Sequence, residues 1–254
     1  MQKWRGYIVC LVMICLGGFS GEAQRSLKHS PESDLQAMHL KGKVKQLYDS
    51  IVWFGKRGDT LIQNGEEHST TWFDTNGNEA QLINIHKLRM LYTYTFDKMN
   101  YKMKMVTTYL PDSGQTYTIY KYDSAGNMIE DDLFAKNGTP EDINKYEYDS
   151  MGRNIEMLEY YSPTRYAGRM EYKLDSLGNV LEETSSPSDR EAAIIYTRTY
   201  DSKGNIVTDQ NMGNGYITND FQYTFDNMGN WIKQICLSKE MIRSVTIRKI
   251  EYYK

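Results

Sequence analysis

The stretch YDSAGN, residues Tyr122 to Asn127, recurs along the chain with small changes. Its other copies read FDTNGN from Phe73, YDSMGR from Tyr148, LDSLGN from Leu174, YDSKGN from Tyr200 and FDNMGN from Phe225. Degraded copies begin at Phe96 and Tyr48. The aspartate of this phrase returns about every 25 residues, and a fixed period of that size indicates a repeat architecture whose units do not fold alone.

The phrase has the residue choice of a tight hairpin turn. Its Asp accepts backbone N–H groups inside the turn, and its Gly adopts positive φ without a Cβ clash. We expect a type I turn that closes a three-residue hairpin loop with a bulge at the glycine. Asn100 replaces the glycine in one degraded copy, and asparagine tolerates that backbone region. The expected turn residues are Asp74, Gly77, Asp123, Gly126, Asp149, Gly152, Asp175, Gly178, Asp201, Gly204, Asp226 and Gly229.

Such a turn sets the register of the two strands that it joins. The expected apolar pairs are Tyr122 with Met128, Leu174 with Val180, Tyr200 with Ile206 and Phe225 with Trp231. Tyr94, Tyr120, Tyr146, Tyr172 and Tyr223 continue this stripe. On the other face the same register places Ile129 opposite Lys121 and Leu181 opposite Lys173. One face is therefore expected to be core and the other half-exposed.

Successive hairpins need a second, looser connection between phrases. Its candidates are Asn64-Gly65, Ser113-Gly114, Asn137-Gly138, Ala167-Gly168, Ser186-Pro187 and Asn214-Gly215. Two strands per unit over about eight units predict an all-β fold, an antiparallel meander of β-hairpin repeats with roughly sixteen strands. Open sheets rarely exceed ~10 strands without curling, so we expect a long, twisted or coiled open sheet or shell. Periodicity does not separate this from a closed ring such as a β-propeller.

Residues 1–23 have the form of a secretory signal peptide. Lys3 and Arg5 precede an apolar run, and Gly21-Glu22-Ala23 offers a cleavage site. Cys15 raises lipid attachment as an alternative, although Ile14 before it is bulkier than the residue usual at such sites. Residues 24–40 lack the phrase and are expected to be a flexible lead-in to a single repeat domain at 41–254. We expect an extracytoplasmic protein, periplasmic, surface-associated or secreted, with no transmembrane span after cleavage.

Charge and cysteine content exclude some partners and some sources of stability. The formal net charge is −3 with no basic run, which argues against a nucleic-acid or acidic-membrane partner. Cys236 is the only thiol outside the leader, so we expect no intramolecular disulfide. Arg243, Arg248 and Lys249 lie on the last expected strand, as is typical of an edge strand protected against association.

The phrases resemble the YD repeat, also called the RHS repeat, of bacterial cell-surface and toxin-associated proteins. The residues that carry the resemblance are Tyr122-Asp123, Gly126-Asn127, Tyr148-Asp149, Gly152-Arg153, Tyr200-Asp201 and Gly204-Asn205. It covers the chain from about Tyr48 to the C-terminus. The resemblance implies β-hairpins that wind into a sheet or hollow shell, a bacterial extracytoplasmic setting and, in some members, carbohydrate binding. This chain is short for the family and lacks a recognisable self-cleaving core, so we do not expect it to encapsulate a toxin.

The sequence shows no catalytic or metal-binding constellation. The histidines His29, His39, His68 and His86 lack metal-ligand spacing, and Cys236 is expected to be a small core residue. Most phrases supply one carboxylate, too few for a calcium loop. Asp131 and Asp132 are adjacent and would point to opposite faces of a strand. We therefore expect no enzymatic activity, no metal and no cofactor.

Surface aromatic residues are the one feature with binding potential. The candidates for ligand contact are Trp53, Trp72, Tyr160, Tyr161 and Trp231, which could instead fill the packing face. The leading hypothesis is an exported, non-enzymatic binding or scaffold module for an unidentified protein or glycan at the cell surface. The alternatives are a carbohydrate-binding protein and an accessory protein of a toxin system. An outer-membrane barrel is disfavoured because Lys121, Glu147 and Lys173 interrupt any lipid-facing band.

Overall fold

The computed structural model describes residues 33–57, 60–84, 86–188, 192–212 and 216–254. The signal peptide and most of the lead-in expected from the sequence lie outside these residues. The chain forms one short helix, α2 (Asp34–Ala37), and sixteen strands. The strands are β1 (Val44–Arg57), β2 (Thr60–Phe73), β3 (Glu79–Ile83), β4 (Arg89–Phe96), β5 (Lys102–Leu110), β6 (Gly114–Tyr122), β7 (Met128–Ala135), β8 (Pro140–Tyr148), β9 (Asn154–Ser162), β10 (Arg165–Leu174), β11 (Val180–Pro187), β12 (Ile194–Tyr200), β13 (Ile206–Asn211), β14 (Ile217–Phe225), β15 (Trp231–Ser238) and β16 (Met241–Tyr252).

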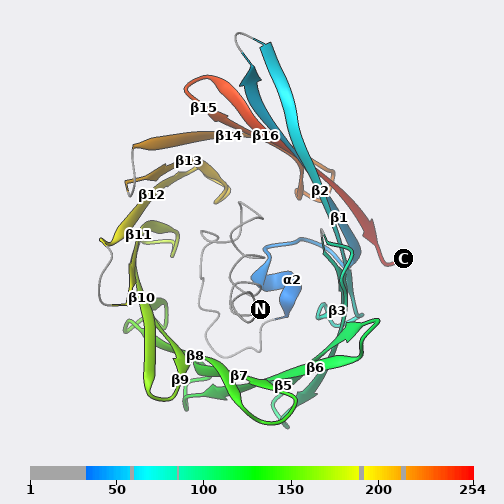
Figure 1. Cartoon of the computed structure of the whole chain (residues 1–254), viewed down its shortest axis with the longest axis vertical. Helices are drawn as coiled ribbons and strands as arrows, with labels where there is room; N and C mark the ends of the chain where they lie inside the picture. Colours follow the sequence, from blue (N-terminus) through cyan, green and yellow to red (C-terminus); the bar gives the residue numbers. More distant parts are fainter. Residues whose placement is uncertain (1–32, 58–59, 85, 189–191, 213–215) are drawn as a thin grey trace.

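The sixteen strands form a closed antiparallel barrel in sequence order (Figure 1). The all-β antiparallel meander is confirmed, whereas the expectation of an open twisted or coiled sheet or shell is wrong. β1 pairs with β16 from Val44↔Tyr252 to Trp53↔Ser244, so the two ends of the meander meet. Closure removes both sheet edges that an open meander would leave exposed.

The phrase forms the hairpin turn that its residues predict. In the copy at Tyr122, the N–H of Gly126 donates to the carbonyl of Asp123, and the N–H of Asp123 donates to the carbonyl of Asn127. Gly126 has a φ of +85°, and Asn100 takes the same left-handed conformation at +69°. One carboxylate oxygen of Asp123 accepts the N–H groups of Ala125 and Asn127, both at 2.9 Å.

Two further residues of the phrase have roles that the sequence did not reveal. The side-chain amide of Asn127 donates to the second carboxylate oxygen of Asp123 at 2.8 Å. The phrase tyrosine reaches back to the preceding hairpin, where it donates to the backbone carbonyl 20 residues earlier. The donor and acceptor pairs are Tyr122 with Lys102, Tyr148 with Met128 and Tyr200 with Val180. Each such tyrosine therefore ties one repeat to the one before it.

The predicted register holds at the turn and fails one pair further away. Tyr122↔Met128, Leu174↔Val180, Tyr200↔Ile206 and Phe225↔Trp231 are all paired as expected. A bulge then shifts the strands, so Lys121 faces Glu130 instead of Ile129, and Lys173 faces Glu182 instead of Leu181. The same shift follows each of the seven phrase turns from Phe73 onward. Bulges bend and twist a strand, and this recurring one favours curvature of the whole wall.

The second connections match the expected dipeptides only in part. Ser113 and Gly138 adopt positive φ between strands, at +53° and +85°, as turn residues do. Asn64-Gly65 instead lies inside β2 at a bulge, and Ala167-Gly168 lies inside β10. Asn214-Gly215 lies outside the described residues. Asn-Gly and Ala-Gly also occur at bulges, so the dipeptide alone does not locate a reversal.

Helix α2 lies within the ring of strands in the view along the barrel (Figure 1). The sequence did not predict this helix, which falls within the expected lead-in. Leu35 of α2 is buried with Val44, Leu47 and Phe73, and its N–H donates to the carbonyl of Gly77. The apolar core is therefore concentrated where the two ends of the meander meet.

The terminal strand is not an edge strand, and its charges do not serve as edge protection. β16 pairs with β15 on one side and with β1 on the other. Arg248 is buried, and its Nε lies 3.0 Å from Oδ1 of Asp49 on β1. The sequence interpretation of Arg248 failed because it assumed that the sheet stayed open.

Candidate functional site

The wall has an inner face rich in tyrosine and an outer face rich in charge. Tyr94 contacts Asp34 of α2, which places its side of β4 toward the interior. The alternation of side chains along paired strands puts the phrase tyrosines and the tyrosines two residues before them on the same side. We call these residues, together with Tyr92 two positions before Tyr94, the inner tyrosine face. It consists of Tyr92, Tyr94, Tyr120, Tyr122, Tyr146, Tyr148, Tyr172, Tyr200 and Tyr223.

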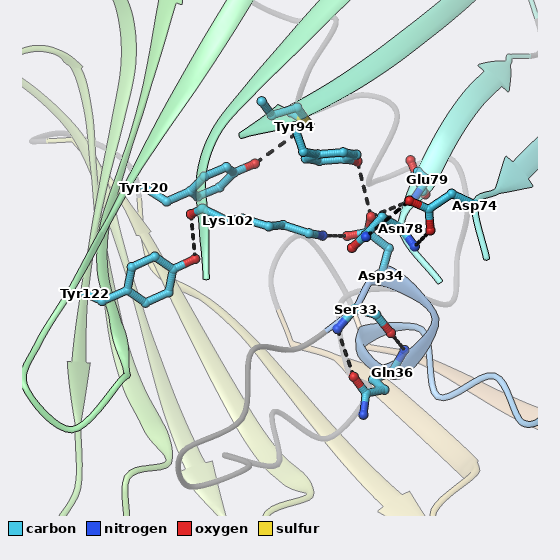
Figure 2. A network of polar contacts seen from close by, with 11 residues as sticks. Ser33, Asp34, Gln36, Asp74, Asn78, Glu79, Tyr94, Lys102, Tyr120 and Tyr122 are labelled. Carbon is cyan, nitrogen blue, oxygen red and sulfur yellow. Dashed lines mark hydrogen bonds and ion pairs between the residues drawn. The ribbon is translucent and has the colours of Figure 1, made fainter. Parts of the chain in front are cut away.

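One end of the inner face is held by a polar network around Asp34 (Figure 2). Lys102 donates to Oδ1 of Asp34 at 2.5 Å, and the Tyr94 hydroxyl donates to Oδ2 at 3.2 Å. The N–H of Glu79 also donates to Oδ2, at 2.7 Å. A capping box between Ser33 and Gln36 begins the helix and orients Asp34 at its first position. The network joins α2 to β3, β4 and β5.

Three inner tyrosines have hydroxyl groups with weak partners. The hydroxyls of Tyr92, Tyr120 and Tyr172 each contact a methionine sulfur, at 3.8, 3.8 and 3.5 Å. A thioether is a weak acceptor, so these hydroxyls retain most of their capacity to bond a ligand. Burial raises the pKa of all three tyrosines above the ordinary value, so they stay protonated donors at neutral pH.

Carboxylates flank the tyrosines on strands β7 and β8. Asp131 accepts the hydroxyl of Tyr146 at 2.5 Å and the amide of Asn144 at 3.3 Å. Burial, reinforced by neighbouring carboxylates, raises the pKa of Asp142 to about 7. Its Oδ1 is buried without a hydrogen-bond partner among the described residues. These groups present hydrogen-bonding atoms in a poorly solvated environment.

A second inner cluster surrounds Arg198, whose side chain is almost fully buried. Two of its nitrogens lie 3.1 Å from Oε2 of Glu183, and Asp209 lies 3.9 Å away. Burial raises the pKa of Glu183 while Arg198 opposes that shift. Arg198 offsets the charge of only one of these two carboxylates, and Oδ1 of Asp209 is buried without a hydrogen-bond partner among the described residues.

The outer face carries ion pairs between neighbouring strands. Lys121 contacts Glu130, and also Asp132 at 2.8 Å. Similar contacts join Arg169 to Glu156 at 2.8 Å, and Lys173 to Glu182. The recurring bulge creates the pairs of Lys121 with Glu130 and Lys173 with Glu182, because it places an acid where the simple register expected an aliphatic residue.

The structure does not bring the predicted ligand-contact aromatics together. Trp53 and Trp231 lie on the inner face, and Trp72 and Tyr160 lie on the outer face. Tyr161 is exposed near a hairpin end, where the guanidinium of Arg165 lies over its ring. The guanidinium of Arg248 lies 3.5 Å from the centre of the Trp231 ring. The indole therefore packs against Arg248. The inner tyrosines form a larger set of aromatic residues, which the sequence pattern predicts only as a packing stripe.

No alternative chemistry gathers in the described part of the chain. Those residues contain no group of three or more His, Cys, Asp or Glu side chains placed to hold a metal ion. The phrase carboxylates are used by their own turns, as at Asp123. Burial raises the pKa of Cys236 to about 11, which keeps the thiol protonated and poorly nucleophilic.

Comparison with solved structures supports the fold and leaves the activity open. A porin-like protein from Bacteroides uniformis matches with a TM-score of 0.54 at 9% identity, over 83% of this chain and 98% of that protein. The TcdB2-TccC3-Cdc42 complex matches with a TM-score of 0.36 at 17% identity, over 78% of this chain and 11% of that one. TcdB2-TccC3 gives a TM-score of 0.35 at 16% identity. The first match is a likeness of fold, and the other two are too weak to carry an argument.

Sequence comparisons add no family. No family model matches the chain. No curated protein matches it either. Among the described residues, no helix has the length and apolarity needed to cross a membrane.

Proposed function

We propose that this protein is an exported, non-enzymatic binding barrel whose inner tyrosine face holds a polyhydroxylated ligand of the glycan class. The observation that carries the proposal is the set of three inward hydroxyls, on Tyr92, Tyr120 and Tyr172, whose hydrogen-bond partner among the described residues is a methionine sulfur. Sugar hydroxyls would supply stronger partners, and the phenol rings offer apolar area against a sugar face.

Barrel size supports an internal site. About eight strands already give an interior that side chains fill, whereas barrels of 16–18 strands leave an aqueous lumen. This barrel has sixteen strands, and α2 occupies part of one end. The proposal therefore places the ligand along the inner wall of β4, β6 and β10, beside the Asp34 network at its β4 end.

The outer face argues for a barrel that stands in water and does not span a bilayer. A Lys or Arg on the lipid-facing side of a barrel costs about 2–4 kcal/mol at the bilayer midplane. Lys121, Lys145, Arg169 and Lys173 all lie on the outer face and are at least about two-fifths exposed. Together with the leader-like residues 1–23, this supports an extracytoplasmic setting. The YD-repeat relationship belongs to the same proposal and is supported by the recurring turn.

Glycan-array screening of the exported protein, followed by calorimetry on any hit, tests the ligand class. The informative variant is the triple change Tyr92→Phe, Tyr120→Phe and Tyr172→Phe, which removes three hydroxyls and keeps the rings. We expect a loss of affinity of at least tenfold, since each lost hydrogen bond contributes about 0.5–1.5 kcal/mol. The melting temperature should change little because the lost partner is a sulfur atom.

The matched control is Tyr160→Phe, which removes a hydroxyl from the outer face. It should leave glycan affinity unchanged. Retained affinity in the triple variant, or the absence of any glycan ligand, would contradict the inner site. If chromatography showed that a bound glycan is converted into new products, the non-enzymatic assignment would be contradicted.

A further inference from the structure

Large exposed hydrophobic side chains gather at the end of the barrel formed by the phrase turns. Four of them occupy the third position of a turn, namely Met99, Met151, Leu177 and Met228, with exposed fractions of 70, 56, 65 and 50%. Five more occupy the recurring bulge, and their exposed fractions lie between 36% and 41%. These are Met103, Ile129, Ile155, Leu181 and Val207. We call the first set the tip residues and the second set the shoulder residues.

Local geometry explains both sets. The third residue of the turn precedes the left-handed glycine and stands at the apex of the loop. In the bulge, two residues share one partner, so the extra side chain joins its neighbour on the outer face. Ile129 thereby lies beside Glu130 on the outside of the wall. Tips and shoulders form an apolar rim at one end of the barrel, interrupted at the turns that carry Asn76 and Lys203.

The rim is shallow and ends at a row of mostly polar residue pairs on the outer face. Three strand residues of about 3.3 Å each, tilted by about 40°, place a shoulder within roughly 8 Å of its tip along the barrel axis. These next outer pairs include Lys121 with Glu130, Lys173 with Glu182 and the uncharged pair Thr199 with Thr208. Amphipathic elements that lie in a membrane interface bury their apolar side by about 5–10 Å. The apolar depth of the rim therefore matches the depth of a bilayer interface.

The spacing of the rim residues favours a fluid partner over a rigid one. Met151 and Leu177 stand on neighbouring turns, two strands or about 10 Å apart. Met99 and Met228 are each four strands from the nearest of these two, because the turns between them carry Ala125 and Lys203 at the third position. Such separated side chains do not form the contiguous apolar core of a protein interface. They can enter a lipid surface independently, and the flexible Met side chains at three of the four apolar tips suit that environment. The phrase carboxylates nearby are hydrogen-bonded within their own turns, which reduces the cost of approaching lipid.

We propose that this rim docks on the surface of a lipid bilayer, with tips and shoulders inserted and the polar row beyond them left in water. The inference uses a different surface from the inner tyrosine face and does not depend on glycan binding. Apolar insertion supplies the affinity, so binding should need no anionic lipid. This agrees with the acidic net charge of the chain.

Vesicle flotation of the exported protein tests the proposal, with neutral phosphatidylcholine vesicles and vesicles containing phosphatidylglycerol. The protein should float with both kinds. The variant Met99→Ser with Leu177→Ser should lose binding by about tenfold or more, because two large apolar side chains no longer enter the lipid. The second variant, Met151→Ser with Leu181→Ser, should behave in the same way.

The matched control is Leu61→Ser with Ile217→Ser, two exposed residues at the opposite end of the barrel, 44% and 51% exposed. It should float like the unchanged protein, and circular dichroism should show that all variants fold. The proposal is overturned if neutral vesicles are not bound, or if the control loses as much binding as the rim variants. It is also overturned if sedimentation shows a dimer that the rim changes dissociate, because a second copy would then cover the rim.

Discussion

The repeated wall and the seam between β1 and β16 hold together by different means. In the wall, the contacts join residues within about one repeat of each other, such as the Tyr200 hydroxyl and the carbonyl of Val180 at 2.8 Å. At the seam, the contacts join the two ends of the chain. Asp49 pairs with Arg248, and the hydroxyl of Tyr253 donates to the carbonyl of Phe73 at 2.7 Å.

The difference shows that a repeat sequence can build a curved wall without determining how it ends. The wall distributes its stabilising contacts over many similar units, so no single unit is decisive. The seam depends on a few buried contacts that occur once, together with the small apolar core around Leu35 and Val44. Substitutions at the seam should therefore cost more than equivalent substitutions in the wall.

The largest expected effect comes from breaking a buried ion pair, once at the seam and once in the wall. Asp49→Ala leaves the Arg248 guanidinium buried without its carboxylate and should lower the free energy of unfolding by about 3–5 kcal/mol. Glu183→Ala in the wall should cost less, because Asp209 remains 3.9 Å from Arg198. Urea unfolding measures both variants. Equal losses would remove the distinction between seam and wall.

The next effect tests a single wall hairpin. Gly204 has a φ of +85°, so Gly204→Val should cost about 1–3 kcal/mol in backbone strain. Lys203→Val changes the neighbouring apex residue, which does not need positive φ, and should cost less. Thermal melting compares the two. Similar shifts in melting temperature would count against the turn geometry.

Two buried carboxyl groups, one beside α2 and one in the wall, should make the stability of the fold depend on pH. Burial, with the nearby Asp34 carboxylate, raises the pKa of Glu79 beside α2 to about 7, and burial raises that of Asp142 in the wall to about 7. Both folded values lie above the ordinary carboxyl values, so the folded state binds more protons and stability should fall as pH rises from about 4 through 7. Glu79→Gln and Asp142→Asn should each remove part of this fall, on the order of 1–3 kcal/mol.

Chemical denaturation at pH 5 and pH 8 measures these contributions. A fall that neither variant reduces would exclude both carboxyls as its source. A fall reduced only by Glu79→Gln would place the pH sensitivity at the α2 end of the barrel.

The smallest expected effect concerns the tie between repeats. Tyr200→Phe removes the hydrogen bond to the carbonyl of Val180 and should cost about 0.5–1.5 kcal/mol. Tyr216→Phe, at a side chain 71% exposed, is the control and should change stability little. Unfolding by urea would resolve the difference. A loss as large as that of Asp49→Ala would mean that single wall contacts are as decisive as the seam.

Local features of the fold were predictable to the residue. The turn at Asp123 to Gly126 and the pair Tyr122↔Met128 follow from a few neighbouring residues and their backbone preferences. The bulge at Ile129 was not predictable in this way, because two strands share it and its sequence is that of an ordinary strand. The error at Lys121 and Lys173 comes from this one extra residue.

The candidate site was only partly accessible to sequence reading. The tyrosine stripe was visible in the positions of Tyr94, Tyr120, Tyr146 and Tyr172, and it was interpreted as packing. Whether this stripe faces an interior depends on closure of the barrel, because an open sheet has no inside. Asp34, which marks the inner face, lies on a four-residue helix too short to give a periodic signal.

By itself the sequence determined the number of strands, their antiparallel order and the chemistry of the turns, because these depend on residues close together in the chain. Tertiary structure alone decided that β16 meets β1, which face becomes the interior, and that Arg248 is buried instead of exposed. The physical reason is that closure depends on twist and bulges accumulated over the whole sheet. Its contacts join residues 199 positions apart, as between Asp49 and Arg248, where no local pattern records them.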